Sequence, residues 1–195
     1  MNELEKRAKG ILYAANDPVI AEDLNKCKDL CFEFNSIKPS DIRKREEMLK
    51  NIFGEVKSIL AVQSPFECDF GYNISIGENF YANHGLVILD GAKVKFGDNV
   101  FVGPNCGFHS AGHPIDSERR NQELEYAHPI NVGDNVWFGA GVNVLPGVSI
   151  GNNVVIGAGS IVNKDIPDNV VAAGNPCKVL RNITEDEKNK NYNFR

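Results

Sequence analysis

Residues 130–163 read INVGDNVWFGAGVNVLPGVSIGNNVVIGAGSIVN and decide the fold. In this stretch a branched or aromatic residue stands at every sixth position, and a second series with the same stride runs two positions earlier. A period of six matches neither an α-helix nor ordinary strands, but it is typical of a parallel β-helix, in which short strands alternate with turns. The two series are Val132, Phe138, Val144, Ile150, Ile156 and Val162, and Ile130, Val136, Val142, Val148, Val154 and Ser160.

A second rhythm supports the same architecture. The string Gly-x-Asn begins at Gly77, Gly97, Gly133 and Gly151, so its copies are 20, 36 and 18 residues apart. Eighteen residues make three hexads, which form one turn of a triangular prism, and 36 residues make two turns. The spacing of 20 predicts two extra residues near Asp90–Lys93. Gly and Asn suit such turns because both tolerate left-handed backbone angles.

The composition indicates a globular chain with one domain and a small appendage. Of its 195 residues, 42% are hydrophobic and 18 are Gly, which fits a turn-rich solenoid. The net charge of −5 argues against nucleic-acid binding. No apolar run reaches membrane-spanning length, and residues 1–10 are too polar for a signal peptide. We therefore expect a cytoplasmic protein that does not bind a membrane.

The cysteines are five in number and contain no Cys-x-x-Cys pair. We expect reduced thiols, as in a cytosolic protein, because a zinc site would need closer clustering. The cysteines are Cys27, Cys31, Cys68, Cys106 and Cys177.

Three regions are predicted along the chain: a helical segment over residues 1–60, a solenoid over residues 61–183 and a tail over residues 184–195. In the first region apolar residues keep helical spacing in two stretches, and a third helix would begin at Ser40 and stop at Gly54. We expect these two or three helices to cover the open end of the solenoid. The two stretches contain Leu4, Ala8, Ile11 and Leu12, and Ile20, Leu24, Cys27 and Cys31.

The sixfold pattern is interrupted over residues 110–129. This segment is too polar to fill an interior, and the pattern resumes in phase at Ile130. We therefore predict a loop that leaves the prism and returns to the same corner, and a long loop on a rigid scaffold often carries function. After Asn163 the pattern loosens and continues two residues early, at Asn169 and Val170.

Several short strings resemble a known family. These strings, together with Gly10, Tyr13, Asp17 and the string Glu33–Asn35, resemble the maltose and galactoside O-acetyltransferases. The resemblance covers nearly the whole chain. The resemblance implies a left-handed β-helix, whose handedness the usual crossover rule does not predict, and a homotrimer with active sites between subunits. The strings are NFYAN at 79–83, GHP at 112–114, NVWFG at 135–139 and AAGNP at 172–176.

The resemblance implies an acetyl-CoA-dependent O-acetyltransferase that acts on a sugar hydroxyl. Its general base would be His113, because a neutral imidazole titrates in the range needed to deprotonate a hydroxyl as it attacks the thioester. The backbone N–H of Ala140 would stabilise the oxyanion, and Asn83 would contact the acetyl donor and position the reacting groups. Glu125 would hydrogen-bond His113 and set its tautomer. Without the resemblance, His113 would be interpreted as a solvated loop histidine.

Acceptor binding is assigned by the same resemblance to Asp17, Asp69 and Tyr81, since carboxylates and phenols make directional hydrogen bonds to sugar hydroxyls. Asp69 is typical of the maltose-type enzymes, and Gly91 stands where the galactoside enzyme has an acidic contact. Surface turns or helix caps are the alternative for the two aspartates. Trp137 alternates with inward residues and should point outward. It would form a ligand wall or a subunit contact, or be an incidental exposed aromatic.

Coenzyme A needs a flat strand edge for its pantetheine arm and cations for its phosphates. The small residues around Ala158, in the string GAGS at 157–160, fit the first need. Lys178 keeps the charge of a family Arg but lacks its planar fork. Ordinary solvated charge is the alternative for any one of the cations alone. The residues that the resemblance places at the nucleotide end are Asn163, Lys164, Lys178 and Arg181.

Three other functions fit the prism. The first is acetyl transfer to another hydroxyl acceptor, a galactoside or an antibiotic, although antibiotic-directed relatives usually lack the helical N-terminus. The second is a metal enzyme of the γ-carbonic-anhydrase type, which needs three histidine ligands, whereas the acetyltransferase needs no metal. The third is a non-catalytic scaffold that only builds a trimer. The histidines, whose flanks do not match the metal enzyme, are His84, His109, His113 and His128.

Overall fold

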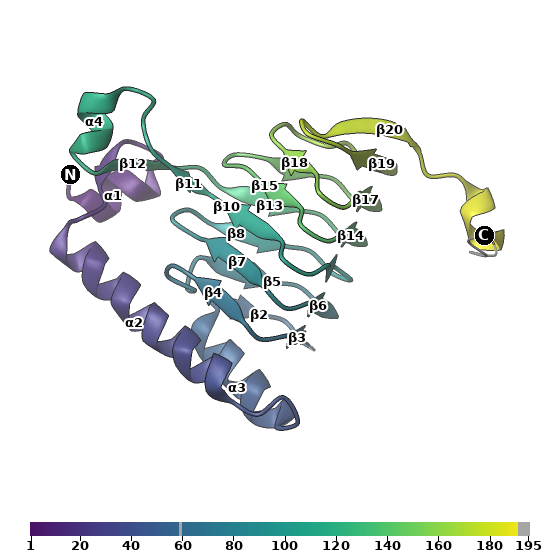
Figure 1. The fold of residues 1–195 in the computed structure, drawn as a ribbon, viewed down its shortest axis with the longest axis horizontal. Helices are drawn as coiled ribbons and strands as arrows, with labels where there is room; N and C mark the ends of the chain where they lie inside the picture. Colours follow the sequence, from purple (N-terminus) through teal and green to yellow (C-terminus); the bar gives the residue numbers. More distant parts are fainter. Residues whose placement is uncertain (59, 191–195) are drawn as a thin grey trace.

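Three parallel β-sheets form the sides of a solenoid in the computed structural model, which describes residues 1–58 and 60–190. From β2 to β10 and from β13 to β19, consecutive strands belong to different sheets, so the backbone coils around a common interior (Figure 1). The first face contains β2 (Glu55–Val56), β5 (Ile74–Ile76), β8 (Val94–Phe96), β13 (Ile130–Val132) and β16 (Ser149–Ile150). The second face contains β3 (Leu60–Val62), β6 (Phe80–Ala82), β9 (Phe101–Val102), β14 (Val136–Phe138), β17 (Val154–Ile156), β19 (Val170–Ala173) and the antiparallel β20 (Lys178–Asn182). The third face contains β4 (Phe66–Cys68), β7 (Leu86–Leu89), β10 (Gly107–His109), β15 (Asn143–Val144) and β18 (Ile161–Val162).

The register between strands shows that the coils differ in length at a single corner. A regular coil takes six residues to pass from the third face to the first, as from Val144 to Ile150. The longer steps run from Cys68 to Ile76, from Ile88 to Phe96, and from Phe108 to Val132. We call this place the loop corner and define it as residues 69–73, 90–93 and 110–129. The two extra residues near Asp90–Lys93 and the return of the long loop to the same corner are both confirmed.

Stacked asparagines form the turns at another corner. Asn79, Asn99, Asn135, Asn153 and Asn169 all have positive φ angles, between 53° and 61°. The Asn79 side chain donates to Asn99 at 3.0 Å, and Asn153 donates to Asn169 at 2.9 Å. These residues carry the Gly-x-Asn rhythm, because Asn tolerates the left-handed region that such a turn requires. The early position of Asn169 is confirmed as well.

A column of phenylalanines fills the interior of the solenoid. The rings of Phe80, Phe96, Phe108 and Phe138 follow one another with centroid separations of 5.1, 4.8 and 5.1 Å. All members of the two sixfold series are buried. Ser160 is the polar exception, and its hydroxyl donates to the Gly157 carbonyl and accepts from the Gly174 N–H. The periodic residues therefore form the core, as their spacing predicts.

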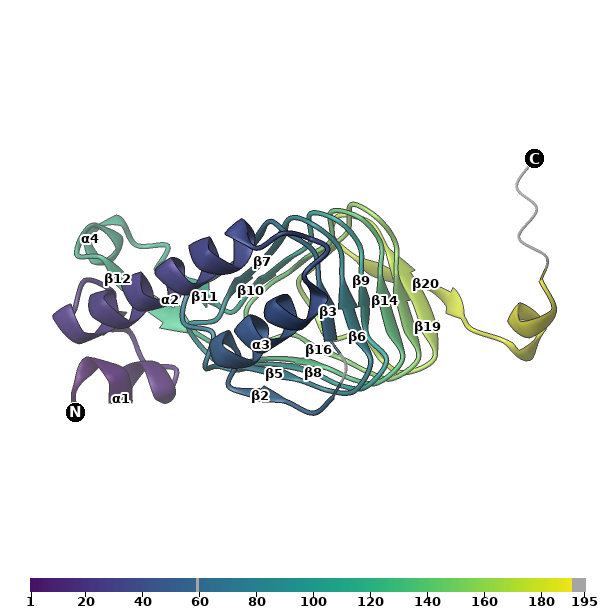
Figure 2. The same ribbon diagram turned by 90° about the horizontal axis from the view of Figure 1, so that it is seen from below.

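Helices cover the open end of the solenoid, at its first coil (Figure 2). These helices are α2 (Pro18–Ser36) and α3 (Ile42–Ile52), whereas α1 (Glu3–Ala8) lies beside the solenoid and packs against β1 (Tyr13–Ala14) and β12 (Leu124–Ala127). Phe34 of α2 and Leu49 of α3 join the same buried cluster as the solenoid core. In the described part of the chain, none of the helices combines the length and apolar character needed to cross a membrane.

Several predicted boundaries were wrong. Ile11 and Leu12 lie outside a helix, because α1 ends at Ala8 and Gly10 adopts a φ of +67°. The N-cap of α3 is Asp41 rather than Ser40, since its carboxylate accepts from the Lys44 N–H at 3.3 Å. The solenoid begins before residue 61, because β2 already pairs with β5. Within the predicted tail, a 3₁₀ helix spans Glu185–Asn189, and residues 191–195 lie outside the described residues.

Candidate active site

The long loop is tied to the N-terminal segment by a small sheet. In this sheet β12 (Leu124–Ala127) lies between β1 (Tyr13–Ala14) and β11 (Ala111–Gly112), and both pairings are antiparallel. The helix α4 (Ser117–Asn121) closes the loop between β11 and β12. His113 follows β11 directly, so its backbone is anchored although the side chain is about half exposed, at 49%.

The His113 ring has one bonded nitrogen and one that faces a carboxylate. Nδ1 lies 3.0 Å from the Leu124 carbonyl oxygen. A carbonyl only accepts, so Nδ1 carries the proton and Nε2 presents its lone pair. Glu125 Oε1 lies 3.6 Å from Nε2, which is beyond hydrogen-bond distance. We predicted that a hydrogen bond from Glu125 sets the tautomer of His113. This was wrong, because the Leu124 carbonyl, and not Glu125, makes the hydrogen bond that sets it.

Glu125 is instead held by Tyr13. The Tyr13 hydroxyl donates to Glu125 Oε2 at 2.6 Å, and Tyr13 is fully buried. Burial raises the pKa of Tyr13 strongly, and the bond to Glu125 raises it further. Tyr13 therefore stays a protonated donor that orients the carboxylate. Sequence reasoning quoted Tyr13 only as part of the resemblance and missed this contact, because its two partners are 112 positions apart.

Two aspartates lie close together at the loop corner. Asp90 Oδ1 accepts from the N–H groups of Asp69 and Phe70 at 3.0 and 2.9 Å. Burial raises the pKa of Asp90 to about 6, and Oδ2 has no hydrogen-bond partner among the described residues. Burial, followed by the charge of Asp90, raises the pKa of Asp69 to about 6 as well. Asp69 is thus fixed by its backbone, and Lys28 Nζ lies 3.9 Å from its carboxylate. Asp90 is a second residue that the sequence analysis missed.

Asp17 caps α2 in this chain. Its Oδ1 accepts from the N–H groups of Val19 and Ile20 at 3.0 and 3.4 Å, which is the usual N-cap arrangement. The helix cap named as the alternative for Asp17 is therefore its observed role, and acceptor binding stays a prediction.

Aromatic residues form a shallow site on the second face. Tyr81, Phe101 and Trp137 are neighbours in register on β6, β9 and β14. Trp137 is 56% exposed, so its predicted outward direction is confirmed. A hollow of about 470 Å³ brings it together with three other predicted site residues, Tyr81, Asn83 and Ala140.

The backbone of Ala140 offers a hydrogen-bond donor at this hollow. Ala140 lies two residues after the end of β14, and its N–H donates no hydrogen bond to the described residues. A side chain at Gly103 would place its Cβ 2.8 Å from the Ala140 nitrogen, so only Gly leaves this N–H uncovered. The Asn83 side-chain oxygen accepts from the His84 N–H at 2.8 Å, which holds the amide beside the hollow. The site therefore has a free amide donor next to an oriented polar side chain.

Comparison with known proteins shows the family. The maltose acetyltransferase hexapeptide capping motif matches residues 6–57, and the bacterial transferase hexapeptide motif of six repeats matches residues 129–164. A Saccharomyces cerevisiae protein named as an acetyltransferase is 54% identical over 194 residues, which cover 98% of this chain and 99% of that protein. The chain belongs to the hexapeptide-repeat acetyltransferases of the maltose and galactoside type.

Solved structures agree with this assignment. The maltose O-acetyltransferase from Clostridium difficile 630 gives a TM-score of 0.93 at 48% identity, covering 95% of this chain and 99% of that one. A galactoside acetyltransferase in complex with coenzyme A gives 0.94 at 44% identity, covering 100% and 96%. The left-handed β-helix class and the expectation of an acetyltransferase are thereby confirmed.

The residues assigned to coenzyme A lie in the last coils of this acetyltransferase. Ala158 is exposed between β17 and β18, and its N–H donates no hydrogen bond to another described residue. Asn163 and Lys164 are exposed directly after β18. Lys178 and Arg181 are exposed on β20, where Arg181 pairs with Glu187 at 2.6 Å. All five are accessible, and Arg181 would have to leave or share its partner to meet a phosphate.

The residues predicted for the chemical step and its neighbourhood form two groups that one chain does not bring together. The first group, at the loop corner, contains His113, Glu125 and Asp69, and we call it the acid–base half-site. The second group, on the second face, contains Tyr81, Asn83, Trp137 and Ala140, and we call it the amide half-site. β11 and β12 lie on the opposite side of the solenoid from β6 and β14 in both views (Figures 1 and 2).

The histidines of the acetyltransferase do not converge on a common point. Among the described residues, the His, Cys, Asp and Glu side chains that approach closely enough to hold an ion are Cys27, Cys31 and Cys68. His109 bonds to Asn143 at 2.9 Å instead. The described part of one chain therefore does not bring together the three histidines that the γ-carbonic-anhydrase alternative requires. The cysteine expectation was also wrong in one respect, because α2 and β4 bring three of these residues into one cluster.

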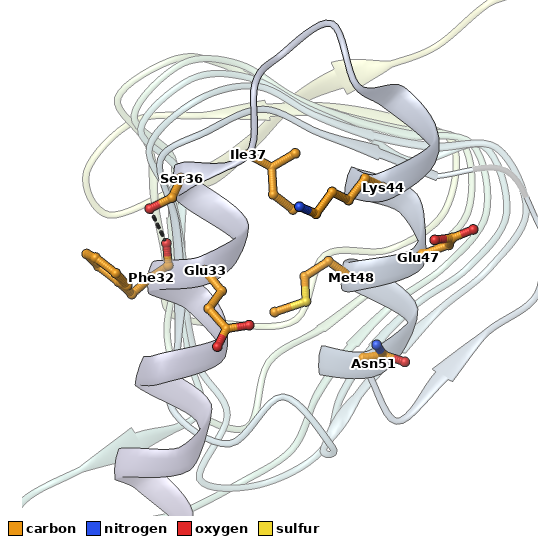
Figure 3. A pocket seen from close by; sticks show the side chains of 8 residues that line it. All are labelled: Phe32, Glu33, Ser36, Ile37, Lys44, Glu47, Met48 and Asn51. Atoms are coloured by element: carbon orange, nitrogen blue, oxygen red, sulfur yellow. Dashed lines mark hydrogen bonds between the residues drawn. The ribbon is translucent and has the colours of Figure 1, made fainter.

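A groove between α2 and α3 lies apart from the predicted site residues. Figure 3 shows α2 contributing Phe32, Glu33 and Ser36, with Ile37 after them, and α3 contributing Lys44, Glu47, Met48 and Asn51. Its volume is about 400 Å³, and the Ser36 hydroxyl donates to the Phe32 carbonyl at its rim. Its charged lining residues are Glu33, Lys44 and Glu47, and none of the residues predicted for acyl transfer lines it.

Proposed function

We propose that the protein transfers the acetyl group of acetyl-CoA to a hydroxyl of a sugar of the maltose or glucose type. The observation that carries the proposal is the His113 ring, whose Nδ1 is bonded to a backbone carbonyl while Nε2 is left as the basic nitrogen at an accessible position. This is the arrangement that a general base requires. The maltose O-acetyltransferase and the coenzyme A complex among the similar structures support the acceptor class and the acyl donor.

The reaction follows from the proposed positions of these groups. The sugar oxygen attacks the thioester carbon while His113 Nε2 takes its proton, so that a C–O bond forms and the carbonyl oxygen becomes an oxyanion. The Ala140 N–H would donate to this oxygen, and Asn83 would position the acetyl donor. The C–S bond then breaks, and the proton held by His113 passes to the departing thiolate. The products are an acetylated sugar and free coenzyme A.

A complete site requires two copies of the chain in this proposal. The acid–base half-site lies at the loop corner and the amide half-site lies on another face, so a neighbouring prism would supply the missing half. The exposed aromatic surface of Phe101 and Trp137 favours such a contact, because large apolar surfaces are commonly covered by partners. We therefore propose a homotrimer with active sites between subunits.

The acceptor would bind at the loop corner. Asp69 is held by Asp90 and would bond a sugar hydroxyl, with Asp17 and the Tyr81 of the neighbouring copy as further contacts. Gly91 offers no side chain there, and a Cβ at this position would lie 3.0 Å from the Ala111 Cβ and 3.3 Å from the Tyr13 hydroxyl. The acidic galactoside contact is therefore missing, which favours the maltose type.

Acceptors compared side by side test the proposal. Acetyl-CoA is supplied with maltose, glucose, a thiogalactoside or chloramphenicol, and release of the free thiol is followed. We expect the fastest release with maltose or glucose, and loss of it in His113→Ala. His128→Ala is the matched control, because His128 is an exposed histidine at the same corner. Thiol release that is no faster with any acceptor than without one contradicts the proposal, and preference for chloramphenicol or the galactoside would reassign the acceptor.

A further inference from the structure

Three cysteine side chains meet between the helical segment and the first coil. The sulfur of Cys68 lies 3.4 Å from that of Cys27 and 3.7 Å from that of Cys31. The three sulfurs all lie within 4.8 Å of one another. Their residues are 3%, 0% and 1% exposed for Cys27, Cys31 and Cys68. All three thiols are free of disulfides.

Two secondary-structure elements direct these sulfurs to one point. Cys27 and Cys31 are four residues apart on α2 and therefore share the helix face that packs on β4. Cys68 alternates with the exposed Glu67, so its side chain points toward the helix side of the first coil. No part of the acetyl-transfer chemistry uses these thiols, although Cys68 directly precedes Asp69.

We propose that Cys27, Cys31 and Cys68 bind one soft monovalent cation of the Cu(I) class in a three-coordinate site. Thiolate ligands select soft ions such as Cu(I) and zinc. Structural zinc almost always takes four ligands, and the described residues place no fourth His, Cys, Asp or Glu ligand in this cluster. Burial also excludes water as the fourth ligand. A three-sulfur site therefore suits the monovalent ion better than zinc.

The spacing of the sulfurs fits such a site closely. Metal–thiolate bonds are about 2.3 Å long, as in zinc sites, so the corners of a trigonal plane of sulfurs lie about 4.0 Å apart. The observed separations are 3.4 and 3.7 Å, with a third of at most 4.8 Å, so each sulfur pair has to change its separation by less than about 1 Å to reach that value. On binding, metal–sulfur bonds form and thiol protons pass to solvent. The metal keeps its oxidation state, so the step needs no oxidant or reductant.

Metal binding would clamp α2 to β4. Cys27 and Cys31 belong to the cap and Cys68 to the first coil, so the ion would add a link between two parts of the chain that already meet through side-chain packing and through the hydrogen bonds of Asn35 with the Phe66 backbone. A ligand that binds only the folded state stabilises it by mass action. At a free concentration a hundredfold above the dissociation constant, we expect the midpoint of thermal unfolding to rise by about 5–10 °C.

The test is an anaerobic titration of the full-length protein with Cu(I), in competition with a coloured Cu(I) chelator. Because the thiols are buried, the ion is also supplied during refolding. We expect one equivalent per chain and loss of that equivalent in Cys27→Ser and Cys68→Ser. Cys106→Ser and Cys177→Ser remove buried thiols outside the cluster and should keep it. Failure of the wild type to take up one equivalent by either route, or full binding in Cys68→Ser, overturns the proposal.

Absorption spectroscopy at the copper edge keeps the test decisive if a serine variant fails to fold. In the loaded wild type we expect three sulfur neighbours at about 2.3 Å. Two sulfurs with nitrogen or oxygen neighbours, or a four-coordinate zinc bound in preference to Cu(I), would contradict the three-coordinate site. The acetyl-transfer assay reads a different part of the molecule, so failure here leaves the proposed reaction standing.

Discussion

The amide half-site and the acid–base half-site are built in different ways. Tyr81, Phe101 and Trp137 occupy the same register position of successive coils, so the amide half-site is a product of the repeat itself. The acid–base half-site lies where the repeat is broken, and it joins β1, the end of β4 and the long loop. The repeat supplies a flat wall with free amides, whereas the irregular corner supplies buried and oriented titratable groups. The proposed reaction thus depends on one regular face and one interrupted corner.

The largest effect is expected from removing the base. His113→Ala should lower kcat by about 10³-fold, since general-base catalysis contributes on the order of 10² to 10⁴. The rest of the loop corner should keep its structure, because the His113 side chain is half exposed and its one hydrogen bond to a described residue joins Nδ1 to the Leu124 carbonyl. Steady-state kinetics of the variant and of His128→Ala check this. A loss of less than tenfold would move the base elsewhere and leave the loop corner with a binding role alone.

Asp90 is expected to have the next largest effect, on stability. Its pKa is raised from 3.8 to about 6 by burial, so the stability that its neutral form provides is fully present below pH 3.8 and is lost as the pH rises through 6. The loss amounts to about 3 kcal/mol in the free energy of unfolding. Asp90→Asn keeps Oδ1 as acceptor for the Asp69 and Phe70 N–H groups but cannot ionise.

Denaturant unfolding at pH 4 and at pH 7.5 measures this difference. The difference in the free energy of unfolding between Asp90→Asn and the wild type should move in favour of Asp90→Asn as the pH rises from 4 to 7.5. Asp98→Asn is a suitable control. Hydrogen bonds from the Glu78 N–H and from Lys57 lower the pKa of the Asp98 carboxylate, so its contribution to stability depends on pH with the opposite sign. Parallel behaviour of Asp90→Asn and the wild type would show that Asp90 is no more costly to ionise than a surface acid.

A smaller effect is expected from Tyr13→Phe. The change removes the 2.6 Å hydrogen bond to Glu125 while keeping the buried ring. Glu125 would then be free to rotate away from His113 Nε2, and we expect kcat to fall about tenfold with little change in the KM for acetyl-CoA, by analogy with the loss of one charge-assisted hydrogen bond. Tyr126→Phe is the control at the same corner. Equal effects on kcat in both variants would assign Tyr13 a purely structural role.

The regular half of this molecule could be predicted in detail and the irregular half could not. Sixfold spacing was enough to predict the buried faces, the outward Trp137 and the corner that carries extra residues. It could not predict that Tyr13 meets Glu125 or that Asp90 clamps Asp69, because these contacts join segments that share no period. The hydrogen bond between His113 and the Leu124 carbonyl could not be predicted either. Every residue has a backbone carbonyl, and only the folded structure shows which one the histidine contacts.

The cysteine cluster illustrates the same limit. Cys27 and Cys31 share a helix face by their spacing, but nothing in the spacing connects them with Cys68, which lies 37 residues beyond Cys31. Resemblance supplied what periodicity lacked for His113 and Asn83, and it offered nothing for these thiols. Contacts between a repeat and a non-repeating cap are therefore the part of this fold that requires coordinates.

The smallest expected loss of activity is that of mixed oligomers made from two variants. Such oligomers also test most directly whether the two half-sites of different copies work together. His113→Ala spoils the acid–base half-site and Asn83→Ala spoils the amide half-site, so each variant alone should be inactive. If one site takes His113 from one copy and Asn83 from another, random mixing by co-refolding leaves both halves intact at about one site in four. The mixture should therefore recover about a quarter of wild-type activity, a fourfold deficit. Should both half-sites serve the same site within a single copy, mixing would restore nothing, and the separation seen in one chain would have to close by a movement of the long loop.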